Sequence, residues 1–362
     1  MQKSTTPTST SSSPLMANQP SLLEQLLEVK SVSTGSPDTF TNTGALWHPP
    51  DAQGIYGGIC IAQSLTAAQA TVPPNFFPHS SHGQFIQAGR PDEKIVFHVS
   101  RISDGKSFAT RSVNACQQER VIFSSLISFA KSVKSTRRQV NHHETMPRDV
   151  PSPPRYDHSR MVFQNFDGDT PPFLTKKVGI ANVNPVNPHE KRIHQWNRAS
   201  QKISTSGGIY AHLAALAYIC DNYFVGTIPH VHGIWDFVKP PLTEFDVGGQ
   251  DLSQESRQHI RVPGSGESIN STHDQEDERL RIGMMVTLNH TMFFHAPKAV
   301  RADEWMLSEL SSHWAGEGRG VAMQKIWSQD GVLLATCVQE GIVRLADQSH
   351  VHNFGSKPKS RL

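Results

Sequence analysis

The feature that most constrains this chain is an internal repeat, in which two glycines open a long apolar stretch. The sequence GGICIAQSL begins at Gly57 and leads into an Ala-rich run, and GGIYAHL begins at Gly207 and leads into a second one. Each run is apolar on nearly every helical face. The repeat therefore predicts one buried helix at 58–70 and another at 208–220, each at the centre of a similar structural unit.

Each predicted helix is followed by a set of segments with β character. These are Ile95–Ile102, Ser107–Ala115 and Arg120–Ala130 in the first half, and Met284–Phe294, Trp305–Ser311, Arg319–Trp327 and Val332–Leu345 in the second. Turn sequences such as Ser103-Asp104-Gly105 and Gln329-Asp330-Gly331 separate neighbouring segments. The pattern predicts an α+β fold made twice, with a curved antiparallel sheet around a central helix. An alternating α/β sheet is the weaker alternative, because helices are few and strands come in runs.

Composition divides the chain into expected domains and connecting segments. We expect a disordered Ser/Thr-rich tail at 1–20, an N-terminal domain at 21–146, a Pro-rich linker at 147–194, a C-terminal domain at 195–348 and a short tail at 349–362. The second domain carries a polar insertion at 243–281 with almost no large apolar residues. Such a composition predicts a mobile surface loop.

Charge and cysteine usage exclude several classes of function. The formal charge is +2, from 34 Lys and Arg against 32 Asp and Glu, so nothing in the bulk electrostatics favours nucleic acid or an anionic membrane. No apolar run reaches the roughly 18 residues that would predict a membrane-spanning helix. The four cysteines are far apart and lack CxxC spacing, which argues against a zinc knuckle or a disulfide framework. We therefore expect a reducing compartment, no metal and no cofactor.

The last three residues, Ser360-Arg361-Leu362, are a conservative variant of the SKL peroxisomal signal. Lys357 and Lys359 lie just upstream. The alternative is a basic tail that matches by chance, but the match falls at the very C-terminus, where the import receptor reads the signal. The sequence therefore predicts a peroxisomal matrix protein with the import receptor as a partner.

Candidate catalytic residues are polar side chains in apolar settings, since the sequence has no GxSxG, HExxH or P-loop motif. Asp221 ends the second helix after ALAYIC, Thr287 lies in MMVTLNHTMFF and Gln339 lies in VLLATCVQEGIV. A carboxylate at a helix C-terminus is disfavoured by the helix dipole and must be hydrogen-bonded if buried. When the two halves of the repeat are compared, Thr71 is at the position equivalent to Asp221 and Ser128 is at the position equivalent to Gln339. One half thus looks catalytic and the other structural, although a lone Thr or Gln in a strand is more often only a satisfied polar group.

In these residues and the motifs around them, the chain resembles the acyl-CoA thioesterase II (TesB-like) family, whose members contain two fused hotdog domains. In the first half the resemblance rests on LWHPPDAQGIYGG at 46–58 and DGKSFATRSV at 104–113. In the second half it rests on LAYICDNYF at 216–224, TLNHTMFFHAP at 287–297 and GRGVAMQKIWSQDGVLLATCVQEGIVR at 318–344. The resemblance implies hydrolysis of acyl-CoA to a free carboxylic acid and coenzyme A, within fatty-acid or specialised-metabolite pathways. Eukaryotic members are commonly peroxisomal, in keeping with the C-terminal tripeptide.

The resemblance also implies a catalytic trio of Asp221, Thr287 and Gln339. The three side chains would hold a water molecule, and Asp221 would accept its proton as the water attacks the thioester. His290 is the alternative base nearest to Thr287 in sequence. Asn289 replaces an acidic residue that the family usually has before the strand histidine, which puts substrate choice in question.

Backbone N–H groups at the start of a buried helix could stabilise the oxyanion that forms. Two glycine pairs qualify, Gly57 with Gly58 and Gly207 with Gly208, and the sequence leaves the choice between them open. Alternative functions are an acyl-CoA-binding or acyl-transferring hotdog protein without efficient hydrolysis, and a non-catalytic scaffold. A homo-oligomer is compatible with each of them.

Overall fold

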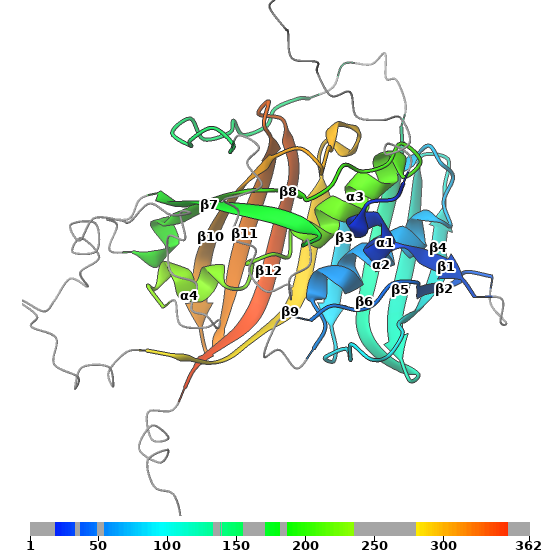
Figure 1. The fold of residues 1–362 in the computed structure, drawn as a ribbon, viewed down its shortest axis with the longest axis horizontal. Helices are drawn as coiled ribbons and strands as arrows, with labels where there is room; N and C mark the ends of the chain where they lie inside the picture. The colour runs from blue at the N-terminus through cyan, green and yellow to red at the C-terminus, as the bar shows by residue number, and fades with distance from the viewer. Residues whose placement is uncertain are drawn as a thin grey trace, which may run out of the picture.

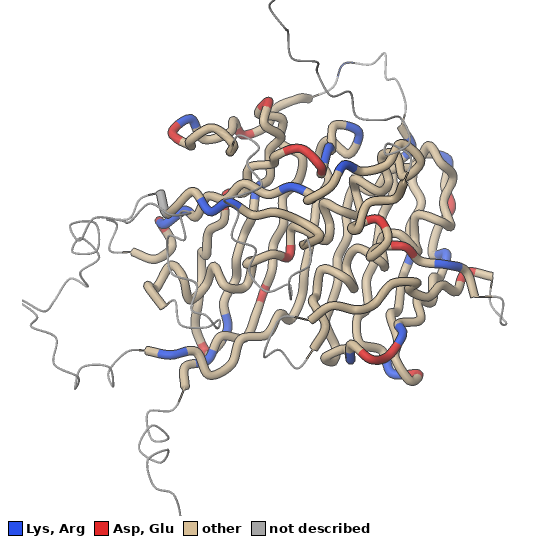
Figure 2. The backbone as a smooth tube through the Cα atoms, in the orientation of Figure 1, with Lys and Arg blue, Asp and Glu red and all other residues tan. Residues whose placement is uncertain are grey.

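The computed structural model describes residues 19–32, 37–48, 54–132, 138, 140–154, 171–181, 187–234 and 280–346. These residues form one twelve-stranded antiparallel sheet that curves around two central helices (Figure 1). Among them no helix is long and apolar enough to cross a membrane. Lys and Arg are interspersed with Asp and Glu over both halves of the molecule (Figure 2), as the nearly balanced composition indicates.

In each half a central helix precedes a run of strands, as the repeat predicts. The first half contains α1 (Leu22–Leu27), β1 (Val29–Ser31), β2 (Thr39–Asn42), α2 (Gly57–Gln69), β3 (Phe76–Phe85), β4 (Val96–Asp104), β5 (Phe108–Gln117) and β6 (Arg120–Lys131). The second half contains β7 (Phe173–Ala181), β8 (Arg192–Ala199), α3 (Gly208–Ile219), α4 (Thr227–Val231), β9 (Ile282–Phe294), β10 (Met306–Gly316), β11 (Arg319–Ser328) and β12 (Leu333–Leu345). Short 3-10 turns lie at Pro188–Glu190 and Pro297–Ala299.

The sheet joins the two halves through one strand pair at its centre. The strand order is β1-β2-β4-β5-β6-β3-β9-β12-β11-β10-β8-β7, and every neighbouring pair is antiparallel. The halves meet where β3 pairs with β9, from Ser80 opposite Phe293 to Gln84 opposite Asn289. The α+β prediction is confirmed, and the alternating α/β alternative is wrong because no neighbouring strands run parallel in the described sheet.

Both central helices are buried because they present apolar or small side chains on nearly every face. Burial runs from Gly58 to Leu65 in α2 and from Leu213 to Ile219 in α3. The ends of the two helices approach each other closely: a Cβ on Gly58 would lie 2.6 Å from the backbone oxygen of Tyr218. A glycine is therefore required where the start of α2 meets the end of α3, and the predicted helices are correct to within about one residue.

Five strands lie where the sequence does not indicate them, namely β1, β2, β3, β7 and β8. β7 falls inside the segment expected to be a Pro-rich linker, and it forms an edge of the sheet by pairing with β8. β3 contains Pro78 and Gly83, residues that strands usually avoid, and a register irregularity follows Pro78. Tertiary pairing on both sides, with β6 and β9, supplies the stability that local propensity does not.

Three expected segments lie outside the described residues. They are residues 1–18 of the N-terminal tail, residues 243–279 of the polar insertion, and the C-terminal tail at 349–362 with its tripeptide.

Candidate active site

Asp221 lies where the end of α3 meets the start of α2. Gln339 on β12 donates a hydrogen bond from Nε2 to Asp221 Oδ1 over 2.7 Å, and the Gly58 backbone N–H donates a second one to the same carboxylate. A Cβ on Gly57 would lie only 2.8 Å from Asp221 Oδ2. The carboxylate is thus held between the two halves, with α3 and β12 from the second half and α2 from the first.

The environment makes Asp221 a better base than an ordinary aspartate. Burial raises its pKa to about 6, against the opposing effects of His290 and of the hydrogen bonds from Gln339 and Gly58. The positive end of the α2 dipole also favours the ionised form. A carboxylate with this pKa is largely ionised at neutral pH and still accepts a proton more readily than an exposed aspartate does.

The side-chain amide of Gln339 has a hydrogen-bond partner for its nitrogen but, among the residues that the structure describes, none for its oxygen. Its side chain is only 1% exposed, and its Nε2 donates to Asp221. Its Oε1 has no hydrogen-bond partner among the described residues. A buried amide oxygen without a partner is unfavourable, so this atom is available to accept a hydrogen bond from a water molecule or a ligand.

Thr287 reaches the same face of the sheet through a β-bulge. In the pairing of β9 with β12, His290 is opposite Gln339 and Asn289 is opposite Glu340, but the next pair is Thr287 with Gly341. The extra residue shifts the alternation, so Thr287 lies on the face of Gln339 and His290. No hydrogen bond joins Thr287 to Asp221 or Gln339 in the part of the chain that the structure describes. Strict alternation would have placed Thr287 on the opposite face, and the sequence carries no signal for the bulge.

The two glycine pairs differ in what their N–H groups contact. Gly207 N–H donates to Ser204 Oγ over 3.0 Å and Gly208 N–H to the Ser204 carbonyl over 3.4 Å. The Glu24 carboxylate caps the same end, accepting bonds from both the backbone N–H and the hydroxyl of Ser204. Gly57, by contrast, has an N–H without a hydrogen bond among the described residues, beside Asp221. The start of α2 therefore adjoins the trio, and the start of α3 is already capped.

Comparison with known proteins identifies the family. The family model described as the acyl-CoA thioesterase C-terminal domain matches residues 146–343, and the acyl-CoA thioesterase N-terminal domain matches residues 45–130. The chain belongs to the acyl-CoA thioesterase family. This thioesterase is 31% identical over 320 residues to acyl-coenzyme A thioesterase 8 of Mus musculus, a match that covers 83% of each chain.

Two further relatives agree with that assignment. The thioesterase is 26% identical over 357 residues to the peroxisomal acyl-coenzyme A thioester hydrolase 1 of Saccharomyces cerevisiae, covering 89% of this chain and 94% of the yeast protein. The crystal structure of an acyl-CoA thioesterase II, TesB2, from Mycobacterium marinum is 26% identical and superposes with a TM-score of 0.60, covering 93% of this chain and 99% of that one. The chain is a TesB-like acyl-CoA thioester hydrolase with a double hotdog fold, as its sequence motifs predict.

The first half of the thioesterase has no carboxylate at the position equivalent to Asp221. Thr71 stands there, and Arg111 donates from Nε to Thr71 Oγ1 over 2.7 Å and from Nη2 to the Thr71 carbonyl over 3.0 Å. The Arg111 side chain is 0% exposed, and it also pairs with Asp104. Ser128, at the position equivalent to Gln339, contacts His79 Nε2 at 2.8 Å. Sequence reasoning identified the substitution of Asp by Thr but missed the buried arginine that accompanies it.

Asn289 lies on the other face of β9 from the trio. Its side chain forms a two-way contact with Glu340, donating from Nδ2 to Glu340 Oε2 over 3.0 Å and accepting from the Glu340 N–H over 3.2 Å. The side chain is therefore occupied in strand pairing, and it does not alter the contacts of Asp221 or Gln339.

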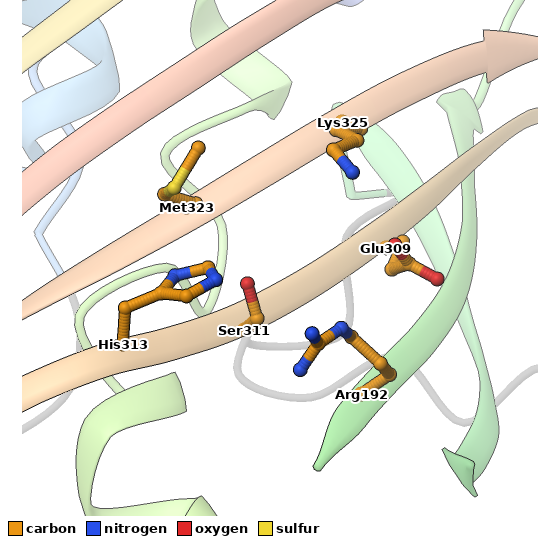
Figure 3. A pocket seen from close by; sticks show the side chains of 6 residues that line it. All are labelled: Arg192, Glu309, Ser311, His313, Met323 and Lys325. Carbon is orange, nitrogen blue, oxygen red and sulfur yellow. The ribbon is translucent and has the colours of Figure 1, made fainter. Parts of the chain in front are cut away.

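Two surface hollows of the thioesterase do not include the trio. One is lined by Arg192, Glu309, Ser311, His313, Met323 and Lys325 on β8, β10 and β11 (Figure 3). The other is lined by His82, Gly83, Gln84, Ser112, Ser124, Ser125, Leu126, Asn289 and Thr291. The candidate active site is therefore defined by its hydrogen bonds and register, not by either hollow.

Proposed function

We propose that this thioesterase hydrolyses acyl-CoA with Asp221 as general base, assisted by Gln339 and Thr287. The observation that carries the proposal is the 2.7 Å hydrogen bond from Gln339 Nε2 to Asp221 Oδ1. It orients the carboxylate, and Gln339 Oε1 has no partner among the described residues, so this oxygen can accept a hydrogen bond beside the base. A water molecule held by these groups would be oriented for attack on a thioester carbonyl.

The reaction needs no covalent enzyme intermediate. The water oxygen bonds to the thioester carbon, its proton passes to Asp221, and the carbonyl electron pair moves onto oxygen. Collapse of the tetrahedral intermediate re-forms the carbonyl, breaks the carbon–sulfur bond and releases coenzyme A as a thiolate, which takes up a proton. Thr287 supports the water from the adjacent strand. The raised pKa of Asp221, about 6, suits a base that works near neutral pH.

The oxyanion of the tetrahedral intermediate needs donors close to the attacked carbonyl. We assign this role to the start of α2, with the Gly57 N–H as the donor. Two observations support it: the Gly57 N–H has no partner among the described residues, and Gly57 packs directly against the Asp221 carboxylate. The Gly58 N–H already binds Asp221. The α2 dipole adds favourable electrostatics at the same point.

We further propose that the enzyme acts in the peroxisomal matrix, on acyl-CoAs of fatty-acid or specialised-metabolite pathways. The support is the tripeptide Ser360-Arg361-Leu362, which would engage the import receptor, and the yeast relative that is named a peroxisomal enzyme. We also propose that the two domains span residues 21–146 and 195–348 and that the enzyme forms a homo-oligomer.

A thiol-release assay on the purified full chain tests the function. A panel of acyl-CoAs of different chain length is incubated with the wild type and with Asp221→Asn, and free coenzyme A is measured by chromatography. Hydrolysis by the wild type that falls at least 100-fold in the variant supports the mechanism. An acyl-CoA-binding or acyl-transferring protein would instead show a thermal shift with the ligands and no difference in coenzyme A release between the two proteins.

A further inference from the structure

A cluster of buried soft donor atoms lies directly beneath the candidate active site, and the proposed hydrolysis does not use it. Cys220 caps the end of α3, His290 is on β9 and Cys337 is on β12, and each is at most 1% exposed. One donor atom from each lies within 4.8 Å of the other two. The Cys220 Sγ is 3.5 Å from His290 Nε2 and 4.0 Å from the sulfur of Met292.

The sheet register explains why these side chains converge. Cys337 is opposite Met292, and Gln339 is opposite His290, so the two strands present consecutive side-chain pairs on the helix-facing side. Cys220 lies over these pairs because α3 ends there. Two sulfurs, one imidazole nitrogen and one thioether thus come from three different elements, an arrangement that sequence spacing alone cannot reveal.

The spacing of the donors fits a tetrahedral metal ion. With zinc–sulfur bonds of about 2.3 Å and zinc–nitrogen bonds of about 2.0–2.1 Å, tetrahedral angles place a sulfur and a nitrogen about 3.5 Å apart. The observed separation of Cys220 Sγ and His290 Nε2 is 3.5 Å. Thiolate and imidazole ligands select zinc and similar borderline-soft ions over magnesium or calcium. Met292 is placed to supply a weak fourth ligand.

We propose that Cys220, His290 and Cys337 bind one Zn²⁺ ion and that its binding inhibits the thioesterase. On binding, the two thiols release two protons to solvent and become thiolates, and neutral His290 supplies a lone pair, so the charge of the ion is balanced. Cys220 immediately precedes Asp221, and Cys337 lies on β12 two residues before Gln339. Drawing the two sulfurs to one ion shifts both partners of the hydrogen bond between Asp221 and Gln339.

The direct test is metal binding by the full chain, first freed of metal with a chelator. We expect one Zn²⁺ per chain by calorimetry, and thiolate-to-metal charge-transfer absorption with tetrahedral visible bands when Co²⁺ is the probe. Cys337→Ala should weaken Zn²⁺ binding at least 10-fold. Cys116→Ala, a buried cysteine on β5 outside the cluster, should leave it unchanged. Binding far below one equivalent, or equal binding by both variants, would overturn the proposal.

A second measurement uses the wild-type protein, so it does not depend on whether the variants fold. Zn²⁺ should protect Cys220 and Cys337 from alkylation in mild denaturant, while Cys60 and Cys116 stay equally reactive, as read by mass spectrometry of peptides. Equal protection of all four thiols, or of none, contradicts a specific site. Neither measurement depends on hydrolysis, so the metal site can fail while the proposed function stands.

The inhibitory effect is tested last. Zn²⁺ titrated into the thiol-release assay should lower the rate at least 10-fold at saturation, and excess chelator should restore it. Inhibition of Cys337→Ala at the same zinc concentration would show that the ion acts elsewhere and would overturn the inhibitory part of the proposal.

Discussion

Replacing Asp221 by asparagine should remove activity and, at neutral pH, make the protein more stable. The wild-type carboxylate is ionised in a buried position, which raises its pKa from 3.8 to about 6. The folded state therefore binds the proton more tightly than the unfolded chain does, and folding loses stability as the pH rises through this interval. Asparagine has no charge to bury. Its side chain can still accept from the Gly58 N–H and, after rotation of the Gln339 amide, bond to Gln339.

The size of the effect follows from the pKa change. One pKa unit corresponds to about 1.4 kcal/mol, so a rise from 3.8 to about 6 gives an upper bound of about 3 kcal/mol. The Asp221 residue as a whole is half-buried, so solvent screening reduces this bound. We expect a gain of roughly 1–3 kcal/mol in the free energy of unfolding at pH 7.5. That corresponds to a rise of several degrees in Tm. Hydrolysis should fall about 10²–10⁴-fold because the base is lost.

Differential scanning calorimetry at pH 7.5 and pH 5, with chelator in every buffer, measures the change in stability. The Tm difference between Asp221→Asn and the wild type should be positive at pH 7.5 and smaller at pH 5, where much of the wild-type carboxyl is protonated. Thr287→Val is the matched control, since it alters the same trio without changing a charge, and its Tm difference should not depend on pH. The reasoning would be refuted if Asp221→Asn had a lower Tm than the wild type at pH 7.5. It would also be refuted if the Tm difference between the two proteins were the same at pH 7.5 and pH 5.

Four further outcomes are expected. The wild-type rate should rise with pH, reach half its maximum near pH 6 and level off about one pH unit higher, where Asp221 is mostly ionised, as a pH–rate profile will show. Thr287→Val and Gln339→Ala should each reduce coenzyme A release less than Asp221→Asn does, and the triple variant should be far from additive because the three act together. Gly57→Ala should lower kcat more than it changes KM, because its Cβ would lie 2.8 Å from the carboxylate; an unchanged kcat would argue against this end of α2 as the oxyanion site. Removing Ser360–Leu362 should leave hydrolysis intact and move a tagged protein to the cytosol, and continued import would place the targeting signal elsewhere.

The sequence predicts the architecture well because the repeat is carried by strong local patterns. The buried helices follow from uninterrupted apolar runs, and the antiparallel pairing follows from short strands separated by turns. The strands β1, β2, β3, β7 and β8 are not predicted. β7 lies in a segment whose many prolines indicate a linker, and Pro78 and Gly83 interrupt the strand pattern of β3. β3 is ordered by pairing with β6 and β9, which are distant in sequence, and β7 is ordered by pairing with β8, the next strand in the chain.

Some features of the candidate site can likewise be predicted from the sequence, and others cannot. Asp221 and Gln339 stand out in the sequence because a polar side chain in an apolar helix end or strand is costly without a partner, and the structure pairs them. The face on which Thr287 lies depends on a bulge that no residue type signals. The choice between the glycine pairs depends on Ser204 and Glu24, which cap α3 and not α2. Glu24 is 180 residues from Ser204 in the sequence, so this contact cannot be read from a local pattern.

The unequal use of the two halves has a physical basis in the ends of the central helices. At one junction the start of α2 meets the end of α3, and the Asp221 carboxylate lies there bonded to Gln339, whose Oε1 has no partner in the described part of the chain. At the other, Tyr210 near the start of α3 bonds to the Pro74 carbonyl just beyond α2. There the carbonyl of Thr71 is bonded by Arg111, a cation that complements the negative end of α2. A carboxylate placed beside that guanidinium would pair with it, and its pKa would fall instead of rising. The same fold can therefore hold a base at one junction only, unless the arginine is removed as well.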